Sequence, residues 1–138
     1  VASFVVPLCA TIHLAGSTLK IVSFSLAVML LAGIDIHVGI FIGFIFMLGI
    51  TMVAAPGVPG GAIVTAAGLL TSMLGFTEPQ VGLMIATYIA IDSFGTATNV
   101  TGDGAIAMLV DKLIGKKRSD DKVSTSPLPR SAHQTAAQ

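Results

Sequence analysis

The sequence predicts an all-α membrane protein that consists of a broken transmembrane helix, a re-entrant helical hairpin and a long C-terminal transmembrane helix. Hydrophobic residues make up 54% of the 138 residues and charged residues only 10%, whereas soluble domains contain about 25% charged residues. The charges are also segregated, because no Asp, Glu, Lys or Arg lies between Asp35 and Glu78. Two short interruptions divide the apolar sequence, which is typical of transporters with broken helices.

Composition also excludes several function classes. The net charge is zero, so nothing indicates binding to nucleic acid. Cys9 is the only cysteine, and the sequence contains no CxxC, HExxH or Walker-type glycine-rich motif. We therefore expect neither a disulfide framework nor a thiol-ligated metal. The sequence opens with Val1 among apolar residues, without a Met or a basic leader region, and we expect a fragment of a longer protein.

The first element is expected over residues 1–33, as a transmembrane helix with a break at residues 13–18. Residues 1–12 are apolar but too short to span a bilayer, which takes about 20 residues. Gly16 weakens a helix, and the Ser and Thr hydroxyls that follow it can satisfy freed backbone groups at membrane depth. Lys20 is unusual in this apolar context; either snorkelling to the interface or a partner would account for it.

The second element is expected over residues 38–75, as a hairpin with its tip at residues 55–61. Its two apolar arms are short, and the tip contains two prolines and three glycines in seven residues, which forbids a regular helix. Short arms joined by such a tip, without flanking charges, are typical of a re-entrant hairpin. The alternative is a pair of ordinary spanning helices with a tight surface turn, although such turns normally carry polar residues.

The third element is expected over residues 80–117, as one long helix with a polar stripe. At about 100° per residue, five polar side chains fall on one face. They are Tyr88, Asp92, Thr96, Asn99 and Asp103. Ionisable groups inside a membrane are costly unless they face protein, water, an ion or a substrate, so the stripe predicts a functional site. The alternative is a seam of hydrogen bonds between helices, which does not need two carboxylates.

A basic cluster at residues 116–118 closes the third element. By the positive-inside tendency, this end is expected in the cytoplasm. Residues 118–138 are polar and contain proline, so we expect a disordered cytoplasmic tail. The protein is then expected in the plasma membrane, the inner membrane in a bacterium, with lipid as the partner of its apolar helices.

Three stretches resemble the dicarboxylate/amino acid:cation symporter family, which includes glutamate transporters. Residues 99–103 (NVTGD) are similar to a run on the family's eighth helix, residues 56–61 (PGVPGG) to its second hairpin, and residues 7–12 (PLCATI) to the run before its broken seventh helix. Together they cover about residues 1–117. The resemblance implies the glutamate-transporter-like fold, with this chain as the C-terminal part of the transport domain. It also implies a homotrimer, formed through regions that this chain lacks.

The resemblance further implies a substrate site. Asp92 matches the acid that holds the substrate amino group, and Asn99 matches the asparagine that binds the substrate carboxylate. Ser17 stands where the family has a substrate-binding threonine and keeps the hydroxyl. Thr96 matches a threonine of the substrate site, and Val58 belongs, through its carbonyl, to the tip that covers the substrate.

Two sodium sites are implied in the same way. The first uses the Asp103 carboxylate, completed by main-chain oxygens of Cys9, His13 and Asn99. The second uses main-chain carbonyls of Thr11, Met52, Val53 and Ala55. Hard cations prefer oxygen ligands, and interrupted helices supply free carbonyls at membrane depth.

Three departures from the family pattern matter. His13 and Ala15 replace an asparagine and an aspartate that help form a third sodium site. His13 then has two interpretations: a proton carrier that replaces one sodium, or a neutral ring hydrogen-bonded to a carbonyl. Gly95 replaces the arginine that pairs an acidic substrate side chain, which predicts a neutral amino acid over an acidic one. Tyr88 stands where many members carry an acid.

The sequence therefore predicts part of a secondary active symporter, which couples uptake of an amino acid or dicarboxylate to influx of sodium, with a proton as a candidate for one of the ions. In this mechanism the tip at residues 55–61 closes as a gate once cation and solute are bound. No covalent chemistry occurs in it, so we do not expect an enzyme. The alternative is a truncated fragment that does not transport, or that associates with a full-length relative.

Overall fold

The computed structural model describes residues 2–121, with side chains from residue 2 to residue 114. This part of the chain is helical and contains no strand, which confirms the predicted all-α class. Its elements are α1 (Ala2–Ile12), α2 (Ala15–Ala32), α3 (Val38–Met52), α4 (Gly61–Leu74), α5 (Glu78–Ala90) and α6 (Asp92–Asp121).

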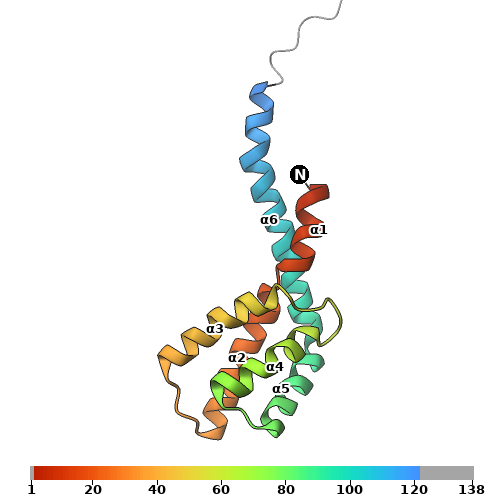
Figure 1. Ribbon diagram of the computed structural model, residues 1–138. Helices are drawn as coiled ribbons and strands as arrows, with labels where there is room; N and C mark the ends of the chain where they lie inside the picture. The colour runs from red at the N-terminus through yellow and green to blue at the C-terminus, as the bar shows by residue number, and fades with distance from the viewer. Residues whose placement is uncertain (1, 122–138) are drawn as a thin grey trace, which may run out of the picture.

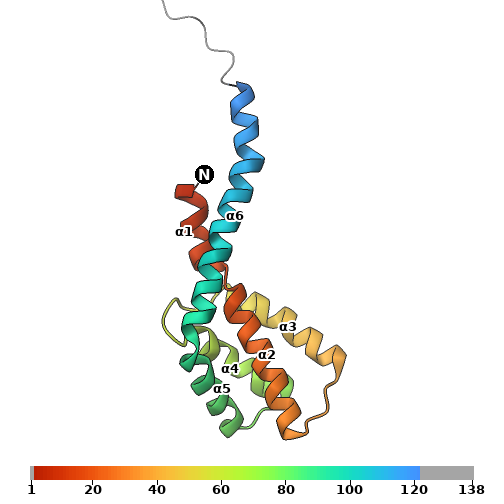
Figure 2. The ribbon, with the colours of Figure 1, turned by 180° about the vertical axis from the view of Figure 1, so that it is seen from behind.

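The helices form two groups that meet near the middle of the molecule. Helices α2, α3, α4 and α5 pack together as a bundle, and α1 and α6 extend side by side from one end of it (Figure 1). The view from behind shows that α6 also runs past the start of α2 (Figure 2). The loop between α3 and α4 curls against this junction in both views. The break between α1 and α2, the loop and the start of α6 are thereby brought together.

The hydrophobic core lies within the bundle. Helix α3 contributes Phe44, Leu48 and Met52, which are spaced four residues apart and therefore share one face. Ile21 from α2 and Leu70 from α4 are completely buried against them. This packing fixes the α3–α4 pair against α2 and thus holds the loop between them near the junction.

The break in the first element is shorter than expected. Only His13 and Leu14 are non-helical, whereas residues 15–18, which the sequence placed in the break, form the first turn of α2. Thr18 compensates for the interruption, because its backbone N–H and its hydroxyl both donate to the Leu14 carbonyl at 2.9 Å. Together, Ala2–Ala32 are long and apolar enough to cross a membrane.

The hairpin tip spans residues 53–60, between the end of α3 and the start of α4. The Gly61 N–H donates to the Val58 carbonyl at 2.8 Å and closes the last turn of the loop. A Cβ at Gly61 would overlap the Pro56 carbonyl oxygen, so only glycine allows this compact fold of the loop. Helices α3 and α4 have 15 and 14 residues, fewer than the 20 or so that a simple span needs.

The third element is not one continuous helix. It divides at Ile91 into α5 and α6, whose axes differ by 63°. The first-turn carboxylate of Asp92 then lies where the partial positive charge of the α6 N-terminus stabilises it. The pair Glu78–Ala90 and Asp92–Ile114 qualifies as a second, broken membrane span. Helix α6 also runs through residues 118–121 of the predicted tail, and residues 122–138 lie outside the described part.

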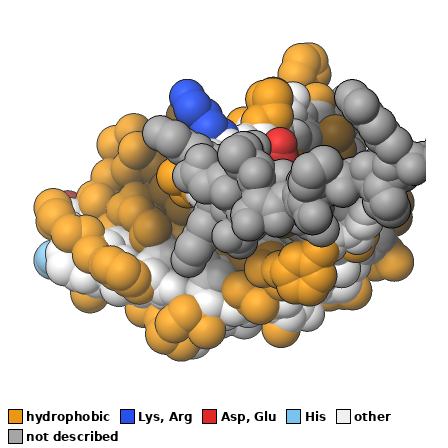
Figure 3. Space-filling model, turned by 90° about the horizontal axis from the view of Figure 1, so that it is seen from above, with side chains coloured by type: hydrophobic (Ala, Val, Ile, Leu, Met, Phe, Trp, Pro, Cys, Tyr) orange, Lys and Arg blue, Asp and Glu red, His pale blue; other side chains and the backbone are white. Residues whose placement is uncertain are grey.

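Where described residues come to the surface in the view from above, apolar side chains predominate and few charged side chains lie among them (Figure 3). Large hydrophobic residues are exposed on every described helix, for example Phe4, Leu31, Phe46 and Phe94, each more than 70% exposed. Water disfavours such a surface, whereas lipid or further protein segments accommodate it.

Candidate functional site

A cavity of about 300 Å³ lies at the junction of α1, α2, the α3–α4 loop, α5 and α6. The loop closes one side of it with residues 56–60. Seven residues of the predicted substrate and sodium sites line it, from three separate parts of the chain. They are His13, Ser17, Val58, Asp92, Thr96, Asn99 and Asp103. The five substrate-site residues implied by the resemblance thus share one space, and Tyr88 joins them.

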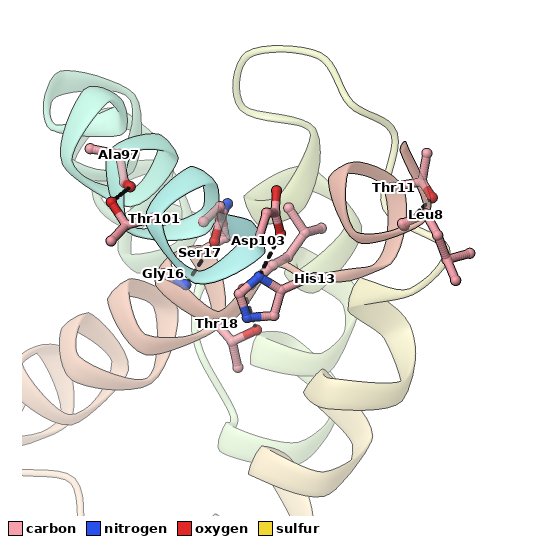
Figure 4. Close-up of polar contacts among 11 residues, drawn as sticks. Leu8, Thr11, His13, Gly16, Ser17, Thr18, Ala97, Thr101 and Asp103 are labelled. Carbon is pink, nitrogen blue, oxygen red and sulfur yellow. Dashed lines mark hydrogen bonds and ion pairs between the residues drawn. The ribbon is translucent and has the colours of Figure 1, made fainter. Parts of the chain in front are cut away.

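Asn99 connects α6 to the start of α2. Its Oδ1 accepts the Gly16 N–H at 2.8 Å, and its Nδ2 donates to the Ser17 hydroxyl oxygen at 3.3 Å. The first N–H groups of any helix lack partners within that helix, so Asn99 caps α2 from another element. Gly16 and Ser17 lie directly beside α6 (Figure 4).

The close approach of α2 to α6 depends on Gly16. A Cβ at this position would lie 2.5 Å from the Gly95 carbonyl oxygen and 2.7 Å from Thr98 Cβ. The two helices can therefore approach to hydrogen-bonding distance only because position 16 has no side chain.

His13 and Asp103 form a second link between the break and α6. The His13 Nδ1 lies 2.8 Å from an Asp103 carboxylate oxygen (Figure 4). Asp103 is buried, and the His13 ring passes over Gly102, where a Cβ would overlap the ring. An uncompensated carboxylate would be costly at this depth, and the imidazole supplies its partner.

Lys20 and Asp92 form a third link. The Lys20 ammonium lies 2.9 Å from an Asp92 carboxylate oxygen and 3.6 Å from the centre of the Tyr88 ring. The lysine side chain is only 9% exposed. It packs on Gly95, where a Cβ would overlap the lysine Cε. Of the two explanations that the sequence left open for Lys20, the structure therefore gives a partner.

The sequence did not reveal Lys20 as part of this site. One signal was present: Lys20 follows Ser17 by three residues, so both lie on the same face of α2. Lys20 is also the only Lys or Arg before Lys112, which makes it the natural partner for a carboxylate at membrane depth.

Comparison with known proteins decides the family. A family model described as the sodium:dicarboxylate symporter family matches residues 1–113. The chain belongs to the sodium:dicarboxylate symporter family. This family is one of integral membrane transporters, not enzymes, and the resemblance found in the three motifs is thereby confirmed.

Several curated transporters are similar to this family member. Excitatory amino acid transporter 3 of Mus musculus is 30% identical over 125 residues, which is 91% of this chain and 24% of the relative. The Homo sapiens protein of the same name has the same identity and coverage. Excitatory amino acid transporter 5 of Mus musculus is 28% identical over 94% of this chain and 23% of the relative. The chain thus spans about a quarter of the length of these relatives. No solved structure gave a significant match.

The remaining residues that the resemblance assigns to the two predicted sodium sites do not line the cavity of this symporter-family chain. They are Cys9, Thr11, Met52, Val53 and Ala55. The Cys9 and Met52 carbonyls accept backbone hydrogen bonds from His13 and Ala55, at 2.8 and 3.1 Å, and the Thr11 hydroxyl donates to the Leu8 carbonyl at 2.7 Å (Figure 4).

Among the described residues, no group of three or more His, Cys, Asp or Glu side chains is placed so that it could hold a metal ion. The predicted cation sites combine the Asp103 carboxylate with main-chain oxygens at the ends of interrupted helices. This donor set fits a hard cation such as sodium.

Proposed function

We propose that this chain forms the solute- and cation-binding part of a secondary active symporter, which couples uptake of an amino acid or dicarboxylate to sodium influx. One observation carries the proposal. Ser17, Val58, Asp92, Thr96 and Asn99, which lie on three stretches of the sequence, line one cavity together with the Asp103 carboxylate. Membership of a sodium-coupled family and similarity to excitatory amino acid transporters support the same activity.

In the proposed mechanism, cation binding prepares the solute site. Sodium binds Asp103 and main-chain oxygens of Cys9, His13 and Asn99 in one site. Carbonyls of the hairpin and of Thr11 form the other site. Hydrogen bonds to Gly16 and Ser17 hold the Asn99 side chain in place. A cation bound to the main-chain oxygen of Asn99 would further restrain this residue, whose amide receives the solute carboxylate. The α3–α4 loop then closes over the filled cavity. Coupling arises because the closed state is favourable only with both ligands bound.

Solute selectivity was predicted from Gly95, which supplies no arginine for an acidic side chain. On this basis we propose that, among amino acids, a neutral side chain is favoured. The hydroxyls of Ser17 and Thr96 and the Val58 carbonyl then contact the rest of the solute. A competition panel of labelled amino acids tests this, and strong inhibition by aspartate without inhibition by serine or alanine would contradict it.

A proton is proposed as the replacement for one sodium of the family, because His13 stands where a sodium-site asparagine is expected. Uptake should then respond to a pH gradient, and His13→Gln should abolish that response. An unchanged gradient response in the variant would contradict the proposal. A plasma-membrane location with a cytoplasmic C-terminus, and a homotrimer formed through other regions of the complete protein, complete the proposed arrangement.

Uptake by the complete protein in proteoliposomes tests the main proposal. An imposed inward sodium gradient should drive accumulation of labelled solute, and Asp103→Asn should reduce this uptake at least tenfold. Thr101→Ala is the matched control on the same helix, because its exposed hydroxyl bonds only the Ala97 carbonyl (Figure 4). Accumulation that is indifferent to the sodium gradient would refute the proposal.

A further inference from the structure

We propose that Lys20 is a specificity-determining residue: it supplies a permanent ammonium partner to Asp92, so that the cavity disfavours solutes with an α-ammonium group. This inference rests on the proposed transport function and narrows its substrate class. The family resemblance assigns the Asp92 carboxylate to the substrate amino group. In this chain the Asp92 carboxylate already forms an ion pair with Lys20.

The geometry places Lys20 behind Asp92. Asp92 lines the cavity and its side chain is 30% exposed, whereas Lys20 is 9% exposed and does not line the cavity. The 2.9 Å contact uses one carboxylate oxygen of Asp92. The Lys20 ammonium therefore does not enter the cavity. It is a positive charge held behind the residues that line the cavity.

Tyr88 and Gly95 provide a space that matches the Lys20 side chain in shape and charge. The Tyr88 ring lies 3.6 Å from the nitrogen on one side, a distance at which the electron-rich ring face attracts a cation. On another side, Gly95 leaves the space that the lysine chain occupies, since a Cβ there would lie 2.8 Å from the nitrogen. Tyr88 on α5 and Asp92 and Gly95 on α6 thus define one position for the ammonium. An exposed ion pair, by contrast, loses side-chain entropy when its two mobile side chains are held together.

A solute ammonium at Asp92 would have to share the carboxylate with Lys20. The two cations would then lie within a few ångströms of each other beside a lysine that is only 9% exposed, where like charges repel more strongly than in bulk water. A carboxylate group of the solute meets no such obstacle. Asn99 and the hydroxyls of Ser17 and Thr96 still line the cavity as hydrogen-bond groups.

The other carboxylate of the cavity is also paired, because Asp103 contacts His13 at 2.8 Å. Neither acid of the cavity is thus left without a basic side chain. The site therefore favours an amine-free carboxylate over the α-amino acid of the same skeleton. Succinate and aspartate are the matched probes, since they differ by one ammonium group.

The test measures binding of succinate and aspartate to the purified complete protein by calorimetry at saturating sodium. The wild-type protein should bind succinate at least tenfold more tightly than aspartate. Lys20→Met keeps an unbranched side chain as far as the ε position and removes the ammonium from Asp92, so it should shift the affinity ratio at least tenfold toward aspartate. Lys20→Arg keeps the charge and should not shift the ratio in that direction. Lys112→Met removes an exposed lysine of α6 and is the matched control.

A double variant, Lys20→Met with Asp92→Asn, guards against misfolding of the single variant, since it leaves no buried charge unpaired. It offers no carboxylate at position 92 to a solute ammonium, so it should still bind succinate more tightly than aspartate. Sodium-dependent binding with equal affinities in the wild-type protein, or a ratio unmoved by Lys20→Met, would overturn this inference and leave the transport function standing. Binding of both probes that ignores sodium would overturn both.

Discussion

Replacement of Gly16 by alanine tests whether the close contact between α2 and α6 builds the site. The added Cβ would lie 2.5 Å from the Gly95 carbonyl oxygen and 2.7 Å from Thr98 Cβ. Neither atom belongs to a flexible side-chain end, so relief requires a shift of one helix against the other. That shift would stretch the 2.8 Å hydrogen bond between the Gly16 N–H and Asn99.

The magnitude follows from three contributions. Overpacking of a tight contact costs about 1–3 kcal/mol, and loss of the hydrogen bond to Asn99 costs about 1 kcal/mol more. Alanine gains about 1 kcal/mol over glycine in helix propensity. The net destabilisation is then about 2 kcal/mol, which corresponds to roughly a 30-fold loss in the ratio of folded to unfolded protein.

Thermal unfolding of the detergent-purified complete protein measures this effect, and solute binding measures its consequence for the site. Gly16→Ala should lower the unfolding midpoint and weaken solute binding. Gly104→Ala on α6 is the matched control, because a Cβ there meets no atom within 4 Å; its midpoint should equal or exceed that of the wild-type protein. A Gly16→Ala protein with wild-type midpoint and affinity would refute the assigned packing.

Three further substitutions probe separate contacts. Asn99→Ala removes both hydrogen bonds to α2 and should weaken solute binding about tenfold or more, as seen by calorimetry; wild-type affinity would contradict the role of the amide. Gly102→Ala places a Cβ in the space of the His13 ring and should lower sodium affinity about tenfold, whereas an unchanged sodium titration would show that the ring can move freely. Gln80→Ala removes the acceptor of the Thr77 N–H at 2.8 Å and should cost about 1 kcal/mol of stability without changing solute affinity; a change in affinity would mean that this turn is coupled to the site.

Local patterns in the sequence predicted the helical class and most of the cavity lining. The polar stripe was predictable because helical periodicity places Asp92, Thr96, Asn99 and Asp103 on one face, and the structure puts all four on one cavity. The tip was predictable because proline and glycine exclude regular helix. Each of these signals depends on residues that are close to one another in the sequence, so neither needs knowledge of the fold.

The contacts between distant residues were not predictable in the same way. No proline or glycine at Ile91 predicts the bend between α5 and α6. Both helices pack on α2, but α5 also packs on α4 whereas α6 also packs on α1. Lys20 and Asp92 are 72 residues apart in sequence, so their pairing depends on how α2 crosses α6. The cap that Asn99 provides to α2 depends on the same crossing.

The most direct test of sodium coupling is the mutual dependence of sodium and solute binding in the purified complete protein. The two affinities should be measured separately, each at low and at saturating concentrations of the other ligand. Sodium should raise the solute affinity, and the solute should raise the sodium affinity by the same factor, as thermodynamic linkage requires; Asp103→Ala should reduce that factor toward one. Affinities that do not depend on each other in the wild-type protein would contradict a sodium-coupled solute site.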